Sequence, residues 1–354
     1  MALGAVRDTN LLYKVGEIIG KESRAIGVNM NFAPVVDINT NPNNPIVNVR
    51  AYSENKELVS SLSNSLIRGM HRWNMLATSK HFPGHGNTET DSHSDIAIIN
   101  STNATLQNID LYPFKSNISN GLMSIMIGHL AIPAIDTVNN LPATLSKNII
   151  NGLLKNSLNY KGLVVTDALN MSAITNYYSS ADAAIKAVEA GNDILLFPKD
   201  EEEAYNGVLF AVRSGQISES RIEHSVRKIL LAKRWTGLDK NRYVDVDKIP
   251  LRVGIQEHLE LSRSLAQKAI TLVRNEQKLI PISPNLKSRY IHIALLDNNR
   301  DAVADNFHNM LKQRITNLST VTLPLKAKRK DYREVISDVQ KSDVVLISAY
   351  TDRK

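Results

Sequence analysis

The stretch Gly162-Leu-Val-Val-Thr-Asp167 is a short apolar run that ends in a carboxylate, and it represents a pattern that recurs along the chain. Runs of this length between helical segments are typical of buried parallel strands. A polar group stands at or near the end of each of the other runs, which span residues 28–37, 75–81, 123–129 and 193–197. A (β/α)8 barrel assembles its active site at the C-terminal ends of its strands. Polar strand ends along a whole segment therefore favour a barrel.

Amphipathic helical patterns separate these runs. Apolar residues recur at three- and four-residue spacing in residues 11–26, 56–73, 145–158, 181–190, 202–213 and 218–235. Ser218 is a suitable N-cap for the last of these helices. The alternation would also suit a doubly wound sheet, but such a sheet concentrates its polar groups at a switch point. We therefore expect an α/β fold with an incomplete TIM-type (β/α) barrel.

The pattern divides the 354 residues into a barrel, a linker and a second domain. Residues 1–235 carry the barrel, and they open on a helix, so we expect one or two N-terminal βα units to be missing. Residues 236–257 include Pro250 and few apolar residues, which predicts a linker. Residues 258–354 predict the start of a second α/β sandwich domain, cut just after a strand. Its expected elements are helices at 258–273 and 302–315 and strands at 290–296 and 344–348.

Composition and charge limit the classes of protein to which this chain can belong. With 43% hydrophobic and 22% charged residues, the chain is typical of globular proteins. No run approaches the roughly 20 apolar residues of a membrane span, and the first ten residues lack the pattern of a secretion signal. The net charge of +7 is dispersed, and the dense basic run at 326–330 is typical of a solvated face. We expect no membrane or nucleic-acid partner, while compartment and oligomeric state stay open.

The densest polar cluster is the loop KHFPGHGNTETDSH at residues 80–93. Its glycine and proline residues place it after the strand that ends near Lys80. So many ionisable groups beside two glycines favour a functional site over a solvated loop, which stays the alternative. Histidines and carboxylates also suit metal ions. The spacing matches no known closed metal site, and a lysine would repel a cation, so we expect no metal.

Two further strand ends carry candidate residues. Asp167 either caps the next helix or stands in the barrel mouth, and the polar loop favours the mouth because both would face it. His129 ends the run at 123–129 and should lie near the same pocket. A lone histidine is more often a satisfied core residue, so that interpretation stays open for His129.

Four motifs occur in order: NFAPVVD at 31–37, RAYS at 50–53, KHFPGHG at 80–86 followed by DSH at 91–93, and VTDALNM at 165–171. Together they resemble glycoside hydrolase family 3, in its bacterial β-N-acetylhexosaminidase branch. The resemblance is close over about residues 1–235, and the remainder resembles the start of a second α/β domain found in longer members. The loop motif with its trailing DSH is the most specific of the four.

The resemblance implies a retaining exo-β-N-acetylglucosaminidase that acts on peptidoglycan-derived or related glycans and needs no cofactor. Asp167 would be the nucleophile that forms a covalent glycosyl-enzyme ester. His93 would be the acid/base, and Asp91 would orient it. Imidazole suits this role because it titrates near neutral pH, and a bonded carboxylate fixes its tautomer.

Substrate-binding residues also follow from the resemblance. Arg50, Lys80 and His81 match family positions that hold sugar hydroxyls, with His129 expected nearby. Charged donors aimed at hydroxyls in a pocket favour one sugar configuration. The expected partner is thus a small glycan. Two features depart from the family: Ala168 stands where many members carry a second acid, and the N-terminal strand with a sugar-binding aspartate has no counterpart here.

Two alternative functions stay open. A histidine acid/base does not repel phosphate as a carboxylate would, which also suits an N-acetylglucosaminide phosphorylase. An incomplete barrel would also suit an inactive domain that binds sugar without turnover. Product analysis with and without phosphate distinguishes a phosphorylase from a hydrolase. Thermal unfolding with and without the sugar, beside an activity assay, identifies a domain that binds sugar without turnover.

Overall fold

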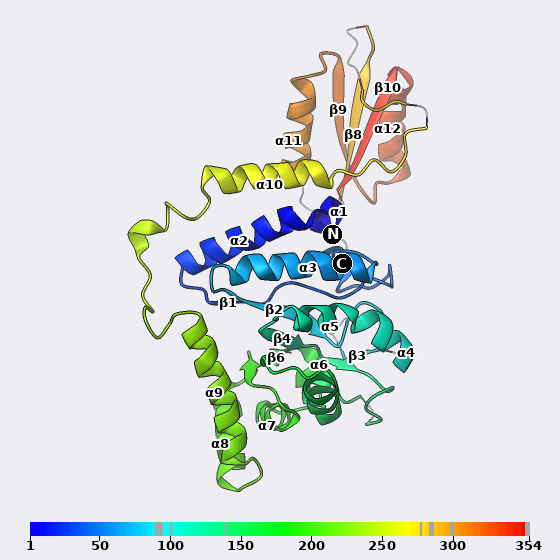
Figure 1. Ribbon diagram of the computed structural model, residues 1–354. Helices are drawn as coiled ribbons and strands as arrows, with labels where there is room; N and C mark the ends of the chain where they lie inside the picture. Colours follow the sequence, from blue (N-terminus) through cyan, green and yellow to red (C-terminus); the bar gives the residue numbers. More distant parts are fainter. Residues whose placement is uncertain are drawn as a thin grey trace. The chain divides into compact units, whose positions relative to one another are not determined.

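The computed structural model (Figure 1) describes residues 1–88, 95–99, 101–138, 140–276, 278–282, 287–297 and 301–350. The chain forms two compact units, Met1–Thr271 and Leu272–Lys354. None of the helices in these described ranges is long and apolar enough to cross a membrane.

The first unit is built on a curled sheet of five parallel strands. With helices packed outside it, this sheet is an incomplete α/β barrel, which confirms the predicted fold class. In spatial order the strands are β1 (Met30–Asn31), β2 (Leu76–Phe82), β4 (Ser124–Ile127), β6 (Leu163–Ala168) and β7 (Ile194–Leu196).

Strand β1 is much shorter than the run at 28–37 predicts. Pro34 interrupts the pairing because it has no N–H to donate to the neighbouring strand. Its carbonyl still accepts a hydrogen bond from the Lys80 N–H at 3.1 Å, and Val35 forms an isolated bridge with Lys80. The segment therefore continues alongside β2 and delivers Asp37 to the end of that strand.

Side-chain caps begin the main helices around the sheet. Ser218 accepts a hydrogen bond from the Arg221 N–H, which confirms it as the N-cap of its helix. Asp8, Asn55 and Asp200 cap three other helices in the same way. The helices that match the sequence predictions are α2 (Thr9–Ala25), α3 (Lys56–His71), η4 (Asn148–Ser157, a π-helix), α7 (Ser180–Ala190), α8 (Glu201–Arg213) and α9 (Glu219–Trp235).

Helix α5 (Tyr112–Ser119) was not predicted, because Pro113 and the polar residues around it obscure the helical period. Proline is tolerated there because it occupies the first turn, where the N–H has no helical partner. The remaining short elements of this unit are α1 (Ala2–Val6), η1 (Asn48–Arg50), β3 (Ala97–Ile98), α4 (Asn103–Thr105), η2 (Leu106–Asp110), β5 (Leu130–Ala131), η3 (Ala143–Leu145), α6 (Ser172–Thr175) and η5 (Val246–Lys248).

The main core lies between the sheet and its helices. Phe82 of β2 and Phe114 of α5 are fully buried and meet edge to face, with ring centroids 5.2 Å apart. Helices α2 and α3 approach so closely that a Cβ at Gly16 would lie 2.2 Å from the Leu66 carbonyl oxygen. Glycine is therefore required at that crossing.

A second apolar cluster closes the base of the sheet. Leu76 and Leu163, at the starts of β2 and β6, pack against Ala232 of α9, with Ile194 of β7 and Trp235 around them. Helix α9 thus covers the N-terminal ends of the strands. The polar residues at the C-terminal ends belong to the opposite face, where barrel sites form.

The second unit is a smaller α/β fold with a parallel sheet of order β10-β8-β9. Strands β8 (Tyr290–Leu296) and β10 (Val344–Tyr350) and helix α11 (Asp301–Lys312) confirm the expected elements. Strand β9 (Leu318–Pro324) and helix α12 (Arg329–Gln340) were missed. Most of β9 is only half-buried or exposed, which weakens its apolar pattern. Helix α12 does carry apolar residues at helical spacing, at Tyr332, Val335, Ile336 and Val339, but it begins within the basic run.

Helix α10 (Gln256–Ala269), which the sequence pattern assigned to the second domain, groups with the first unit. Glu22 of α2 accepts hydrogen bonds from His258 Nδ1 at 2.5 Å and from the Gly254 N–H at 2.9 Å. These contacts attach the first turn of α10 and the residue Gly254 before it to helix α2. The predicted domain boundaries at 1–235, 236–257 and 258–354 stay a prediction.

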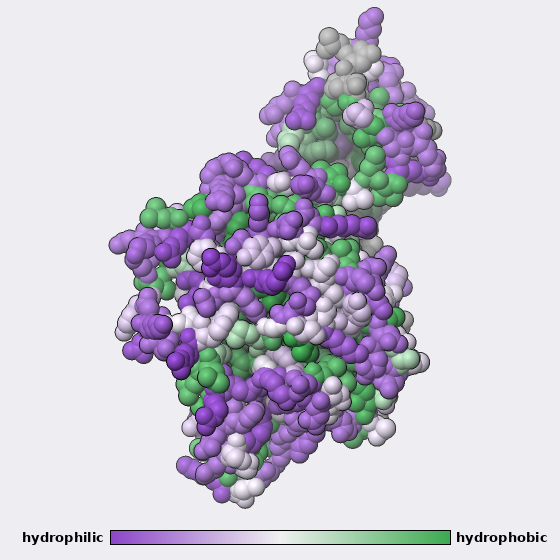
Figure 2. Space-filling model, viewed as in Figure 1, coloured by the Kyte–Doolittle hydropathy of each residue, from purple (hydrophilic) through white to green (hydrophobic). Residues whose placement is uncertain are grey.

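Hydrophilic side chains cover much of the visible surface (Figure 2).

Candidate active site

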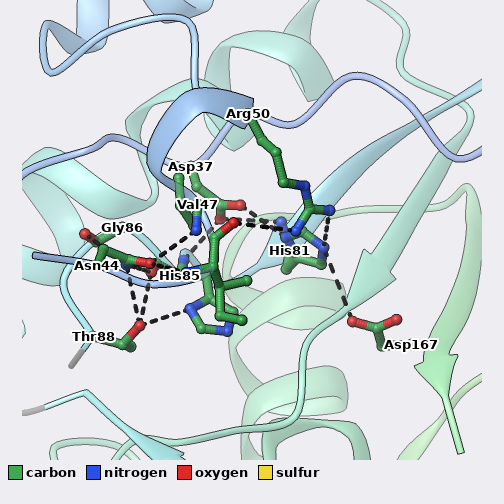
Figure 3. Close-up of polar contacts among 10 residues, drawn as sticks. Asp37, Asn44, Val47, Arg50, His81, His85, Gly86, Thr88 and Asp167 are labelled. Atoms are coloured by element: carbon green, nitrogen blue, oxygen red, sulfur yellow. Dashed lines mark hydrogen bonds and ion pairs between the residues drawn. The ribbon is translucent and has the colours of Figure 1, made fainter. Parts of the chain in front are cut away.

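The C-terminal ends of the strands carry a cluster of charged side chains (Figure 3). Lys80 and His81 come from β2, and Asp167 comes from β6. Arg50 ends η1 and lies beside His81. His129 follows β4 and bonds to the backbone next to Asp167. The other two predicted catalytic residues, Asp91 and His93, lie outside the described residues.

Asp37 fixes the orientation of His81. Its carboxylate is fully buried, and Oδ2 accepts a hydrogen bond from His81 Nδ1 at 2.8 Å. Oδ1 accepts from the backbone N–H groups of His81 at 3.1 Å and His85 at 2.8 Å. Burial alone would raise the pKa of Asp37, but His81 and these hydrogen bonds hold that pKa below its ordinary value. An ionised carboxylate only accepts, so the proton resides on His81 Nδ1.

The other ring nitrogen of His81 faces the site. His81 Nε2 lies 3.5 Å from Arg50 Nη2 and 4.0 Å from Asp167 Oδ2. The Asp167 side chain retains 19% of its exposure, so solvent or a ligand can reach it. Its Oδ1 accepts a hydrogen bond from the Ala168 N–H at 2.8 Å. The structure therefore brings together Arg50, His81 and Asp167 as the sequence predicts.

The surroundings keep Asp167 ionised. Burial would raise its pKa, but His81, His129, the Ala168 N–H and Lys80 together hold that pKa below its ordinary value. Burial and the charge of Arg50 lower the pKa of Lys80, whereas Asp167 and Asp37 act in the opposite direction. A partly exposed carboxylate with an abundance of neighbouring donors is chemically suited to nucleophilic attack.

His129 supports the backbone next to Asp167. The ring is fully buried, with Nδ1 2.7 Å from Thr144 Oγ1 and Nε2 2.9 Å from the Ala168 carbonyl oxygen. That carbonyl only accepts, so Nε2 carries a proton. These contacts fit the core interpretation of a lone histidine. A contact between His129 and substrate stays a prediction.

A buried amide anchors the start of the polar loop. Asn44 Nδ2 donates to the carbonyl oxygens of His85 at 2.7 Å and Gly86 at 3.1 Å (Figure 3). Its Oδ1 accepts from the N–H groups of Ile46 at 2.9 Å and Val47 at 2.8 Å. Sequence reasoning missed Asn44, because an asparagine in the segment NTNPNNP has the composition of an exposed turn.

The loop itself packs tightly against the chain after β1. A Cβ at Gly86 would lie 1.6 Å from the Ile38 carbonyl oxygen, so only glycine fits there. His85 is buried, with Nδ1 2.8 Å from Thr88 Oγ1, and burial lowers its pKa to about 4 despite the attraction of Asp37. His85 is thus neutral at pH 7. Its supporting position was not predicted.

No group of three or more histidine, aspartate or glutamate side chains in the described ranges is arranged to hold a metal ion. Residues 89–94 of the polar loop lie outside those ranges. The absence of a metal site therefore stays a prediction.

Asp110 is a buried acid beneath the polar loop, where a Cβ at Gly84 would lie 2.8 Å from the Asp110 Cβ. Its Oδ2 has no hydrogen-bond partner among the described residues. Burial and the charge of Asp37 raise the pKa of Asp110 to about 7. The pKa of Asp110 is higher in the folded protein than in the unfolded chain. The contribution of Asp110 to the free energy of unfolding is therefore fully present at low pH and is lost as the pH rises towards 7.

Asp110→Asn should therefore raise the thermal midpoint by roughly 5 °C at pH 8 and by much less at pH 4. Differential scanning fluorimetry at both pH values measures the difference. Asp239→Asn, at an exposed position, is the matched control and should show no such pH-dependent gain. An equal gain from Asp110→Asn at both pH values would contradict the assigned titration.

The fold and its charged strand-end cluster define an α/β-barrel protein with a polar site. The chain belongs to glycosyl hydrolase family 3, because the model of that family's N-terminal domain matches residues 1–232.

Relatives and solved structures agree with this assignment. Beta-hexosaminidase A of Pseudoalteromonas piscicida is 34% identical over 303 residues, which cover 80% of this chain and 50% of that protein. A beta-N-acetylglucosaminidase/beta-glucosidase of Cellulomonas fimi is 28% identical over 306 residues, covering 84% and 54%. The structure of a family 3 beta-N-acetylglucosaminidase from Paenibacillus sp. str. FPU-7 has a TM-score of 0.84 and 33% identity, covering 99% of this chain and 67% of that one. The chain spans about half the length of these curated relatives.

Proposed function

We propose that this chain carries the site of a retaining exo-β-N-acetylglucosaminidase with Asp167 as nucleophile. The observation that carries the proposal is the ionised, partly exposed Asp167 beside His81 and Lys80 at the strand ends of a family 3 chain. The names of the relatives, beta-hexosaminidase and beta-N-acetylglucosaminidase, support N-acetylhexosamine as the sugar. Terminal residues of peptidoglycan-derived or related glycans are the proposed substrates.

The proposed reaction has two steps. In the first, an Asp167 carboxylate oxygen attacks the anomeric carbon, and the bond to the leaving-group oxygen breaks as that oxygen takes a proton. In the second, water loses a proton and displaces Asp167 from the ester, which regenerates the carboxylate. His93 is the proposed acid and then base, and Asp91 is proposed to orient it, on the strength of the DSH motif at 91–93.

Substrate binding is assigned to the polar side chains around Asp167. Arg50, Lys80 and His81 are proposed to hold sugar hydroxyls, and the buried Asp37 keeps His81 in place for that purpose. Hydrogen bonds from charged donors in a partly buried site are stronger than those between neutral groups. His129 is proposed to support the backbone next to Asp167, through its hydrogen bond to the Ala168 carbonyl oxygen, and also to contact the sugar.

The full chain should release N-acetylglucosamine from 4-nitrophenyl N-acetyl-β-D-glucosaminide, with the β-anomer formed first in a time-resolved proton NMR experiment. Added phosphate should leave the product unchanged. Initial formation of the α-anomer would contradict a retaining mechanism, and formation of a sugar 1-phosphate would indicate a phosphorylase. A thermal shift with N-acetylglucosamine in the absence of turnover would indicate an inactive binding domain.

A further inference from the structure

Phe197 has an unusual backbone directly after β7, the strand next to the one that carries Asp167. Its φ is 46°, and its side chain is 62% exposed. It is the one aromatic residue among the non-glycine residues with positive φ in the described ranges. A bulky residue in this left-handed region is an outlier, and such outliers concentrate at functional sites.

The local contacts explain the turn but not the aromatic side chain. Leu196 donates its N–H to Thr166 Oγ1 at 2.9 Å, and its carbonyl accepts the Leu169 N–H at 2.8 Å, so the end of β7 is held against β6. Pro198 follows, which further restricts the backbone of Phe197. Glycine would adopt this conformation without strain. Packing does not account for the ring either, because most of it is exposed.

The strand end before Phe197 and the strand with Lys80 and His81 lie on opposite sides of the strand that carries Asp167. Strand β6, which carries Asp167, has β4 on one side and β7 on the other, and β2 with Lys80 and His81 lies beyond β4. Ala168 and Leu196 are paired across β6 and β7, so Phe197 follows the strand end next to Asp167. Neighbouring strands are about 4.8 Å apart, which is within the span of one sugar ring.

We propose that Phe197 is a sugar-binding residue whose ring contacts the apolar C–H face of the sugar bound at Asp167. Arg50, Lys80 and His81 would bind hydroxyls from one side, and Phe197 would supply the apolar contact from the other. Sugar pockets combine aromatic walls with a few placed donors. The strained backbone then holds the ring at the mouth although little of the protein packs on it. This inference rests on the proposed N-acetylglucosaminidase function.

Four variants of the full chain test the proposal with 4-nitrophenyl N-acetyl-β-D-glucosaminide as substrate. Phe197→Ala should raise KM about tenfold with kcat little changed, and Phe197→Tyr should keep KM within about twofold of the wild type. Phe197→Gly should raise KM as much as Phe197→Ala while unfolding at a higher temperature than Phe197→Ala, since glycine tolerates the positive φ. Phe210→Ala removes a similarly exposed phenylalanine ring from α8 and should leave KM unchanged.

An unchanged KM in both Phe197→Ala and Phe197→Gly would overturn the proposal. A rise in KM for Phe197→Tyr as large as that for Phe197→Ala would overturn it as well. Isothermal titration with N-acetylglucosamine separates this failure from failure of the proposed function. Wild-type protein that binds or hydrolyses as expected, with Phe197→Ala unaffected, contradicts the role of Phe197 alone. Wild-type protein that neither binds the sugar nor hydrolyses the glycoside contradicts both.

Discussion

Asp167→Asn should reduce hydrolysis of an aryl N-acetyl-β-D-glucosaminide by about ten thousandfold, because an amide cannot form the glycosyl ester. The carboxylate is held in its ionised form by His81, His129 and Lys80, and its side chain remains partly accessible. The ionised carboxylate is the form that attacks. Burst-corrected initial rates at pH 7 measure the loss.

The matched control for this substitution is Asp136→Asn. Asp136 is also buried and bonded to Ser146 Oγ at 2.5 Å, but it lies outside the charged cluster. It should alter the thermal midpoint without a comparable loss of activity per folded molecule.

Asp167→Ala with added azide should give the α-glycosyl azide, because azide enters from the vacated face. A rate for Asp167→Asn within tenfold of the wild type would exclude Asp167 as the nucleophile.

The parts of the fold that the sequence predicts are those with a strong local signal. Strands β2, β4 and β6 are mostly buried apolar runs, β7 is a half-buried one, and their helical partners carry clear amphipathic periods. The misses have physical causes. Pro34 shortens β1 by removing a donor, Pro113 obscures α5, and the half-exposed face of β9 weakens its apolar pattern.

The parts of the site that could be predicted are residues with a motif of their own. Asp167, Arg50 and His81 stand in recognisable motifs, and the structure places His81 Nε2 3.5 Å from Arg50 and 4.0 Å from Asp167. Asn44 and Asp110 have no such signal, because their burial depends on contacts far along the chain. Asn44, for example, bonds to the carbonyl of a residue 41 positions away. The positions of Asp91 and His93 lie outside the described residues, so their roles stay predictions.

Asp37→Ala should be the most destabilising change in the site, lowering the free energy of unfolding by about 3 to 5 kcal/mol. It would leave two backbone N–H groups and the His81 ring without their buried acceptor. The folded pKa of Asp37 is depressed, so its contribution is present above the ordinary aspartate pKa of about 4 and is lost as pH falls further. Urea unfolding at pH 7 and pH 3.5 should therefore show a smaller difference from the wild type at the lower pH.

Asp37→Asn separates the stabilising role from the positioning role. The amide oxygen can still accept the two N–H groups, but the amide nitrogen would present donors to His81 Nδ1. His81 would then carry its proton on Nε2, the atom that faces Arg50 and Asp167. Stability should fall less than in Asp37→Ala, whereas KM for the aryl glycoside should rise similarly in both. Asp136→Ala, which also removes a buried acceptor, should destabilise without raising KM. If KM followed stability across all three variants, Asp37 would be a structural residue only, and the tautomer of His81 would have no bearing on sugar binding.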